Sequence, residues 1–207
     1  MHVLYAHGFA SGPLSSKGRA VKAHCEARGV GCTLLDLRVP DRDRLRLSAM
    51  IATTVAALPD GPVLGVGSSL GGLTMAHAAQ RDRRLARVLL LAPAFRVAER
   101  WRGRLGETEW ARWQREDVYS YDDHTGGPPL AVDFGFIEDC AAVDTDFPVI
   151  AQPVTVIHGQ RDATVDPELS RIFAARTPHA RLVEVDDDHQ LLSSIPRILA
   201  ELDALLR

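Results

Sequence analysis

The 207-residue sequence has few cysteines, no long apolar run and no excess of one charge. Its three cysteines, Cys25, Cys32 and Cys140, are an odd number without paired spacing. This argues against a disulfide framework and favours a reducing compartment. No second pair of Cys or His residues has metal-ligand spacing, so we expect no metal site. No apolar stretch approaches the roughly 20 residues that a membrane span needs.

The charge is nearly balanced, and the first residues carry no targeting pattern. The chain has 24 Lys and Arg against 27 Asp and Glu, which gives a net charge of -3 at pH 7. Such a mildly negative net charge gives no indication that the protein binds nucleic acid or an anionic membrane. Residues 1–5 start a strand and lack the basic and apolar regions of a signal peptide. We therefore expect a cytoplasmic protein without nucleic-acid or membrane partners; the sequence predicts no oligomeric state.

Short apolar runs alternate with longer amphipathic stretches. The runs lie at residues 3–6, 33–37, 63–66, 88–92, 154–157 and 182–185. Nearly continuous apolarity is typical of strands that are covered on both faces. Helical patterns lie between them, at residues 15–28, 44–58, 70–80, 167–176 and 191–206. This rhythm predicts a single α/β domain over residues 1–207, with a doubly wound and mostly parallel six-stranded sheet.

One segment, from residue 95 to residue 148, breaks this rhythm and shows no clear strand. It holds all three tryptophans, Trp101, Trp110 and Trp113. A long insert of this kind in a compact domain is usually functional, and we interpret it as a short lid. The tryptophans either contact substrate or anchor the insert to the core. Four nearby arginines are typical of a solvated helix face but would also attract an acidic substrate: Arg96, Arg100, Arg102 and Arg104.

A Gly-x-Ser-x-Gly pattern lies between an apolar strand and an Ala-rich helix, at Gly67, Ser69 and Gly71. Such a serine sits on a sharp, strained turn that needs small neighbours and lifts the hydroxyl above the sheet. The N–H of Leu70 would then stand at a helix N-terminus, where it can donate to an oxyanion. The alternative is a Gly/Ser loop that only allows close packing. The pattern predicts a nucleophile elbow with Ser69 as the nucleophile.

A serine nucleophile needs a general base. In proteins with a nucleophile elbow, the catalytic residues follow one another along the chain in the order serine, acid, histidine. His189 follows the last predicted strand, and we predict that it is the base. Asp162 follows the preceding strand and is the predicted acid, which orients the imidazole. The alternatives are Asp166, which stands before a proline as helix N-caps do, and the acidic run 186–188. His158, at the end of the same strand as Asp162, is expected to pack beneath the site.

The loop after the first predicted strand begins with His7, Gly8 and Phe9. In the elbow fold, this loop supplies the second donor to the oxyanion. We predict that the N–H of Phe9 is this donor and that His7 is a weaker candidate for a substrate contact. The alternative is an ordinary turn between a strand and a helix.

Taken together, these motifs resemble those of the α/β-hydrolase superfamily, over essentially the whole chain. The matching segments are residues 7–9, 67–72, 158–166 and 188–189. The chain is similar to small single-domain esterases and thioesterases, and segment 134–140 is similar to the acyl-protein thioesterase and acyl-glucuronide esterase group. The resemblance implies an α/β-hydrolase sheet whose strands, numbered along the chain, have the spatial order 2-1-3-4-5-6.

The motifs and the resemblance predict a serine hydrolase that cleaves carboxylic esters of small or acyl-chain substrates through an acyl-enzyme. Its expected partner is a small-molecule ester or thioester, and the chemistry needs no metal and no cofactor. The alternatives are an acyl-thioesterase of the acyl-protein or acyl-CoA type, an acyl-glucuronide esterase, and a non-catalytic binding protein with the same fold.

Overall fold

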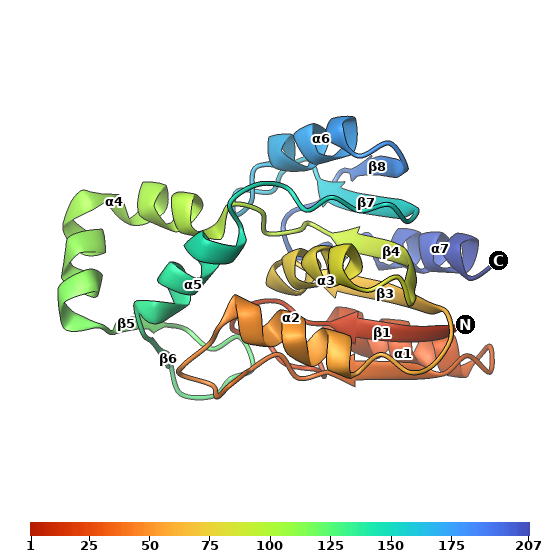
Figure 1. The fold of residues 1–207 in the computed structure, drawn as a ribbon, viewed down its shortest axis with the longest axis horizontal. Coiled ribbons are helices and arrows are strands. Elements are labelled where there is room, and N and C mark those ends of the chain that lie inside the picture. Colours follow the sequence, from red (N-terminus) through yellow and green to blue (C-terminus); the bar gives the residue numbers. More distant parts are fainter.

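The computed structural model describes residues 1–207 and contains a six-stranded parallel sheet with helices on both faces (Figure 1). Its strands are β1 (His2–Ala6), β2 (Cys32–Leu35), β3 (Val63–Ser68), β4 (Leu85–Leu91), β7 (Val154–Gly159) and β8 (Ala180–Val185). Their spatial order is β2-β1-β3-β4-β7-β8. Among these six strands alone, this is the predicted 2-1-3-4-5-6. The labels differ from that series because the insert holds two further strands.

Helices cover both faces of the sheet, as predicted. They are α1 (Ser16–Glu26), α2 (Leu47–Ala56), α3 (Leu70–Arg81), α6 (Pro167–Arg176) and α7 (Ile195–Leu206). Leu4 of β1 belongs to the core under α2, α3 and α6, whereas its neighbour Val3 belongs to the core under α1 and α7. Because successive strand residues point to opposite faces, a strand between two cores is apolar throughout.

Two predicted helices start later in the structure than the sequence pattern suggested. Helix α2 begins at Leu47, because Leu45 forms an isolated antiparallel bridge with Pro40 and Arg46 is still extended. Helix α7 begins at Ile195, because Leu191 has a φ of 53° and takes the chain out of the helical conformation. Apolar periodicity does not reveal either backbone feature.

The insert at residues 95–148 lies beyond the carboxyl ends of the strands (Figure 1). It contains α4 (Val97–Glu116), β5 (Tyr119–Tyr121), β6 (Leu130–Val132) and α5 (Gly135–Val143). The expectation that it has no strand was wrong, because β5 and β6 form an antiparallel hairpin. Each of these strands has three residues, which is too few for an alternating pattern to be read.

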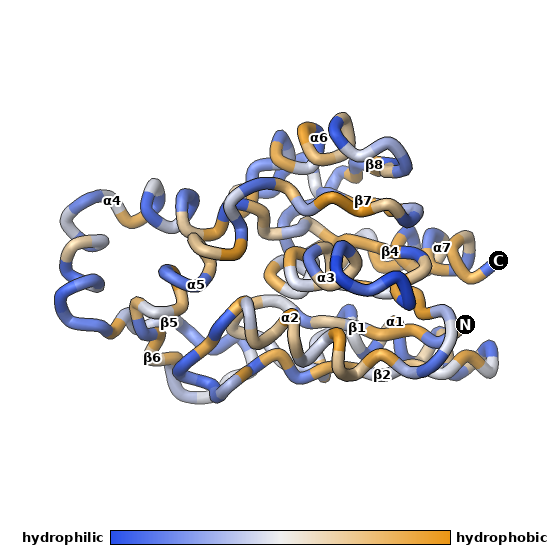
Figure 2. Tube along the Cα trace, viewed as in Figure 1, coloured by the Kyte–Doolittle hydropathy of each residue, from blue (hydrophilic) through white to orange (hydrophobic).

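Helix α4 is bent in the middle. Gly106 has a φ of 72° and a ψ of 168°, a conformation that only glycine adopts without strain. The bend divides α4 into two helical segments that run in different directions (Figure 1). Most of α4 is hydrophilic, in contrast to the apolar strand β7 (Figure 2).

An aromatic cluster forms the core of the insert and reaches the loop after β1. The ring of Trp101 lies 5.4 Å from that of Trp113 and 5.7 Å from that of Tyr121. Phe9 joins the cluster, because its ring lies 5.3 Å from Trp101 and 5.0 Å from Tyr121. Trp113 is fully buried, and its indole Nε1–H donates to the carbonyl of Val132 at 2.9 Å. The insert is therefore packed onto the sheet edge.

None of the helices combines the length and the apolar composition needed to cross a lipid bilayer.

Candidate active site

Ser69 lies on a strained turn between β3 and α3, with a φ of 53° and a ψ of -116°. A non-glycine residue in such a conformation costs about 1–3 kcal/mol, so its surroundings must hold it there. The N–H of Ser69 donates to the carbonyl of Leu91 at 2.8 Å, and its carbonyl accepts from the N–H of Ala94 at 3.0 Å. The end of β4 therefore fixes the turn and the direction of the serine side chain.

The glycines on either side of Ser69 are required by close packing. A Cβ at Gly67 would overlap the backbone of Gly71, and a Cβ at Gly71 would overlap the carbonyl of Ala6. Strand β1, strand β3 and the first turn of α3 thus approach more closely than any side chain would allow. This is the steric reason for the Gly-x-Ser-x-Gly pattern.

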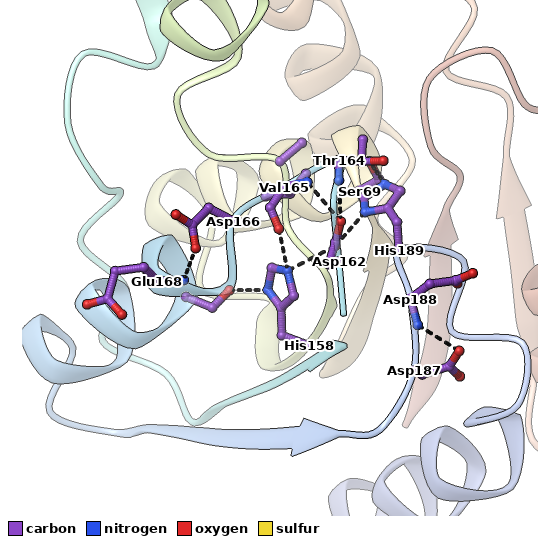
Figure 3. Close-up of polar contacts among 12 residues, drawn as sticks. Ser69, His158, Asp162, Thr164, Val165, Asp166, Glu168, Asp187, Asp188 and His189 are labelled. Atoms are coloured by element: carbon purple, nitrogen blue, oxygen red, sulfur yellow. Dashed lines mark hydrogen bonds and ion pairs between the residues drawn. The ribbon is translucent and has the colours of Figure 1, made fainter. Parts of the chain in front are cut away.

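The structure brings Ser69, His189 and Asp162 together in one line of hydrogen bonds (Figure 3). The Ser69 Oγ lies 2.9 Å from Nε2 of His189, and Nδ1 of His189 lies 2.7 Å from Oδ2 of Asp162. The residues come from the turn after β3 and the loops after β8 and β7, which meet at the carboxyl edge of the sheet. With Nδ1–H donating to Asp162, Nε2 is free to accept the serine proton.

Asp162 is held as a carboxylate by its hydrogen-bond donors. Its Oδ1 accepts from the N–H groups of Thr164 and Val165, each at 2.8 Å, and its Oδ2 accepts from both His189 and His158. Burial favours the neutral acid, but the hydrogen bonds from the two histidines and from Val165 outweigh it and hold the pKa of Asp162 below its ordinary value. Asp162 can therefore stabilise a positively charged imidazole at neutral pH.

His158 lies beneath Asp162 and has hydrogen-bond partners at both ring nitrogens (Figure 3). Its Nε2 lies 3.0 Å from both Oδ2 of Asp162 and the carbonyl of Val165. These groups only accept hydrogen bonds, so Nε2 carries the proton. In the neutral ring, Nδ1 then accepts from the hydroxyl of Ser170 on α6, at 2.7 Å. The fully buried His158 thus ties Asp162 to β7 and α6.

The other carboxylates that we considered as acids have different partners. Asp166 caps the N-terminus of α6, whereas Asp187 and Asp188 accept hydrogen bonds from the backbone of the last loop. None of them forms a hydrogen bond with His189. No group of three His, Cys, Asp or Glu side chains is arranged to hold a metal ion.

Two backbone N–H groups near Ser69 are suitable oxyanion donors. Leu70 is the first residue of α3, and N–H groups in the first turn of a helix lack intrahelical acceptors. The N–H of Phe9 forms no hydrogen bond within the protein. Phe9, Leu70 and Ser69 line the same cavity.

His7 lies beneath this loop and is not among the residues that line the cavity beside Ser69. It is 3% exposed, and its Nδ1–H donates to the carbonyl of Gly8 at 2.8 Å. Its Nε2 accepts from the N–H of Leu37 at 3.0 Å, which requires a neutral ring. Burial lowers the pKa of His7, in agreement with that tautomer. His7 therefore joins the loop after β1 to the end of β2.

The profile of an Uncharacterised protein family (UPF0227) matches residues 2–206. The chain belongs to the UPF0227 family. No curated protein matches this UPF0227 chain in sequence.

The UPF0227 chain has the α/β-hydrolase fold, as its similarity to solved structures shows. Alpha/beta hydrolase domain-containing protein 10 from mouse is 20% identical, with a TM-score of 0.81 over 99% of this chain and 89% of that chain. Est1E from Butyrivibrio proteoclasticus is 21% identical, with a TM-score of 0.74 over 99% and 86%. The Pyrococcus furiosus esterase Pf2001 is 17% identical, with a TM-score of 0.63 over 99% and 81%.

A cavity of about 910 Å³ lies beside Ser69, between the sheet edge and the insert. Trp101 lines it together with Phe9 and Tyr121, whereas Trp110 and Trp113 do not. Of the three tryptophans, only Trp101 is placed where a substrate contact is possible. Trp101 borders the cavity, and the fully buried Trp113 anchors the insert.

Lys17 is a residue of this site that no sequence pattern indicated. It lies in the first turn of α1, is 8% exposed, and its Nζ donates to the carbonyl of Gln190 at 2.5 Å. It also lines the cavity. Burial lowers the pKa of Lys17 to about 8. A single lysine at the start of an amphipathic helix carries no sequence signal, because only the tertiary fold brings it next to the residue that follows His189.

Proposed function

We propose that this protein is a serine hydrolase that cleaves carboxylic esters through a covalent acyl-enzyme. The observation that carries this proposal is the hydrogen-bonded line from the Ser69 hydroxyl through His189 to Asp162, beside a cavity large enough for a small-molecule substrate. A strained serine at a helix N-terminus, paired with a histidine and a buried carboxylate, is the arrangement that activates a nucleophile.

In the first half-reaction, the Ser69 Oγ attacks the ester carbonyl carbon while Nε2 of His189 takes the hydroxyl proton. The negative charge on the carbonyl oxygen is stabilised by the N–H groups of Phe9 and Leu70. Asp162 stabilises the positively charged imidazole through Nδ1–H. When the tetrahedral intermediate collapses, the bond to the alcohol oxygen breaks and His189 gives its proton to the departing alcohol. The acyl group remains on Ser69.

In the second half-reaction, water takes the place of the alcohol. His189 removes a proton from the water, and the resulting hydroxide attacks the acyl carbon. The bond to the Ser69 Oγ then breaks, and His189 returns the proton to the serine. The products are one carboxylic acid and one alcohol, and the enzyme is regenerated without a cofactor.

Two further observations support an ester substrate and a cytoplasmic site of action. Among the similar structures, Pf2001 is named as an esterase, which favours ester cleavage as the first activity to test. All three cysteines are free, as suits a reducing compartment.

The test is hydrolysis of para-nitrophenyl esters with acyl chains from acetyl to palmitoyl, together with matched acyl-thioesters. We expect the wild-type protein to hydrolyse esters and to react with a fluorophosphonate probe. Ser69→Ala should lose at least about 10³-fold in kcat/KM and all labelling. Ser120→Ala, which changes an exposed serine on β5, is the matched control and should retain both.

Three outcomes would contradict the proposal. Equal labelling of Ser69→Ala would remove the assigned nucleophile. A strong preference for thioesters would make the protein a thioesterase. A folded wild-type protein that neither hydrolyses esters nor reacts with the probe would be a binding protein on this fold.

A further inference from the structure

The cavity beside Ser69 is basic, although the chain as a whole is slightly acidic. The only carboxylate side chain in its lining is that of Asp166, whereas five basic side chains line it: Lys17, Arg19, Arg38, Arg100 and Arg104. In the whole chain, acidic residues outnumber basic ones by 27 to 24. The positive charge is therefore concentrated at the site where the substrate would bind.

Some of these charges already have partners. Arg38 forms an ion pair with Asp36, and its Nε lies 2.8 Å from Oδ1 of that residue. Arg19 is exposed and donates to the carbonyl of Leu14. Asp166 uses its carboxylate to cap α6. Besides the exposed Arg19, three basic side chains of the lining have no carboxylate at ion-pair distance, namely Lys17, Arg100 and Arg104.

Lys17 is the most buried of the three. Its Nζ has three donors but a single acceptor in the protein, the carbonyl of Gln190. Burial lowers its pKa to about 8, and the more distant charges of Asp188, Asp187 and Asp162 only partly offset this effect. An ammonium group buried without a direct carboxylate is costly, and an anion bound beside it would offset the cost. Because Gln190 follows His189, this charge lies close to the catalytic histidine.

Arg100 fixes a second charge near the triad. Its Nε donates to the carbonyl of Phe95 at 2.8 Å, and its Nη1 donates to that of Thr164 at 2.9 Å. Thr164 in turn donates its N–H to Asp162. Burial lowers the pKa of Arg100 to about 10, which still leaves the guanidinium charged at neutral pH. Backbone carbonyls thus hold the side chain, but no carboxylate neutralises it.

Arg104 presents a third charge on the wall formed by the insert. Its guanidinium carbon lies 4.8 Å from the ring centroid of Trp101 and 5.7 Å from that of Tyr121, so cation–π contacts hold it there. It forms no hydrogen bond and no ion pair within the protein. The neighbouring Arg96 and Arg102, which do not line the cavity, are both paired with glutamates on the same helix.

We propose that the substrate of this site is an ester that carries an anionic group, a carboxylate or a phosphate, which binds to Lys17 and Arg104 in the field of Arg100. The inference deepens the proposed function and rests on it, because the ester bond would be the one that Ser69 cleaves. Charge-assisted hydrogen bonds to the two unneutralised side chains would hold the anion. The basic cavity would also attract anionic esters in preference to neutral ones.

The first test compares matched esters on the wild-type protein. On the alcohol side, para-acetoxybenzoate and para-acetoxyphenyl phosphate are compared with neutral methyl para-acetoxybenzoate. On the acyl side, the mono-para-nitrophenyl ester of adipic acid is compared with para-nitrophenyl hexanoate. Each kcat/KM is divided by the rate of hydroxide hydrolysis, to remove differences in intrinsic reactivity. We expect at least one anionic ester to be preferred about tenfold or more, and less so as salt is added. The pair that shows this preference identifies the anion and the side of the ester that carries it.

The second test removes one charge. Arg104→Met should lower kcat/KM for the anionic ester about tenfold more than it lowers kcat/KM for the neutral ester. Arg104→Lys should restore part of the preference. Arg102→Met, on the same helix but outside the cavity, is the matched control and should behave as wild type. Lys17→Met should also lower the preference, in a variant whose circular dichroism shows that it is folded.

The anion site can be measured separately from catalysis. Para-hydroxybenzoate and phenyl phosphate should change the tryptophan fluorescence of the wild-type protein and of Ser69→Ala, and they should bind more weakly to Arg104→Met. If neutral esters are hydrolysed but anionic esters are not preferred, or if Arg104→Met keeps the preference, the anion site is refuted and the hydrolase stands. If no ester is cleaved but both anions bind in an Arg104-dependent way, the hydrolase is refuted and the anion site stands.

Discussion

The two walls of the cavity, the sheet edge and the insert, are built on different physical principles. At the sheet edge, Ser69 is strained, its flanking glycines permit no side chain, and Asp162 receives hydrogen bonds on both oxygens. The insert wall consists of short elements, a helix bent at Gly106 and exposed arginines around an aromatic cluster. In the proposed function, the geometry of the reaction would thus depend on close backbone packing at the sheet edge, and substrate preference on the side chains of the insert.

Mutation of Asp162, the proposed acid, should have the largest effect on kcat and should impair only the part of the site at the sheet edge. In Asp162→Asn, the amide can donate to Nδ1 of His189 and favour the tautomer whose Nε2 carries the proton. That Nε2 cannot accept a proton from Ser69, so kcat should fall about 10⁴-fold with little change in KM. Asp146→Asn, which alters an exposed ion pair with Arg176, is the matched control. A loss of less than tenfold would show that another group orients His189.

Mutation of His158 should have an intermediate effect, because it removes one of two imidazole donors to Asp162. We expect kcat to fall about tenfold in His158→Ala as the acid becomes less firmly held. His158→Gln, which can keep a donor, should recover part of the activity. His179→Ala, which changes an exposed histidine, is the control. An unchanged kcat in folded His158→Ala would show that the donors from His189 and the backbone suffice.

The same variant should also shift the acid stability. The native pKa of Asp162 lies below its ordinary value, so its carboxylate contributes stability above the ordinary pKa, and this is lost as the pH falls through the native pKa. Without His158, the native pKa should rise, and the midpoint of acid unfolding should move to higher pH. Urea unfolding at several acid pH values separates this shift from simple loss of packing, because a raised native pKa makes the free energy of unfolding less dependent on pH, whereas lost packing lowers it equally at every pH. An unchanged pH dependence would contradict the prediction.

A change at the bend of α4 should give the smallest effect on catalysis and should test the insert wall alone. A Cβ at Gly106 meets no atom within 4 Å, so any effect of Gly106→Ala comes from its positive φ. We expect a loss of stability of about 1 kcal/mol and a few-fold change in KM, with kcat unchanged. Gly103→Ala, which also adds a Cβ into open space but within a helical segment, is the matched control. An equal effect of both substitutions would refute a special role for the bend.

The difference between the walls also explains what the sequence could predict. Ser69, Asp162 and His189 were identified because each follows an apolar strand, and the strict packing at Gly67 and Gly71 leaves a recognisable pattern. The structure places their side chains within hydrogen-bond distance of one another, and their catalytic roles belong to the proposed function. The parallel sheet was predictable for a similar reason, since strands between two cores must be apolar along their whole length.

The basic lining of the cavity was not predictable in the same way. The four arginines between residues 96 and 104 look alike in sequence, but Arg100 and Arg104 border the cavity, whereas Arg96 and Arg102 pair with glutamates of α4. Arg100 and Arg104 lie four residues apart on one face of the helical segment before Gly106, but only the packing of the insert turns that face toward the cavity. Lys17 was missed because its position depends on a loop more than 150 residues away in sequence, as its bond to Gln190 shows.

Phe9 belongs to both walls, and this couples them mechanically. Its ring packs with Trp101, Tyr121 and Phe136 in the aromatic cluster, while its backbone N–H is the donor that we assign to the oxyanion. The insert cannot swing outward without separating these rings or pulling on the residue that carries this donor. A substrate too bulky for the cavity would therefore displace the N–H of Phe9 together with its ring. Phe9 would then determine both the largest substrate that fits and the rate of the proposed reaction.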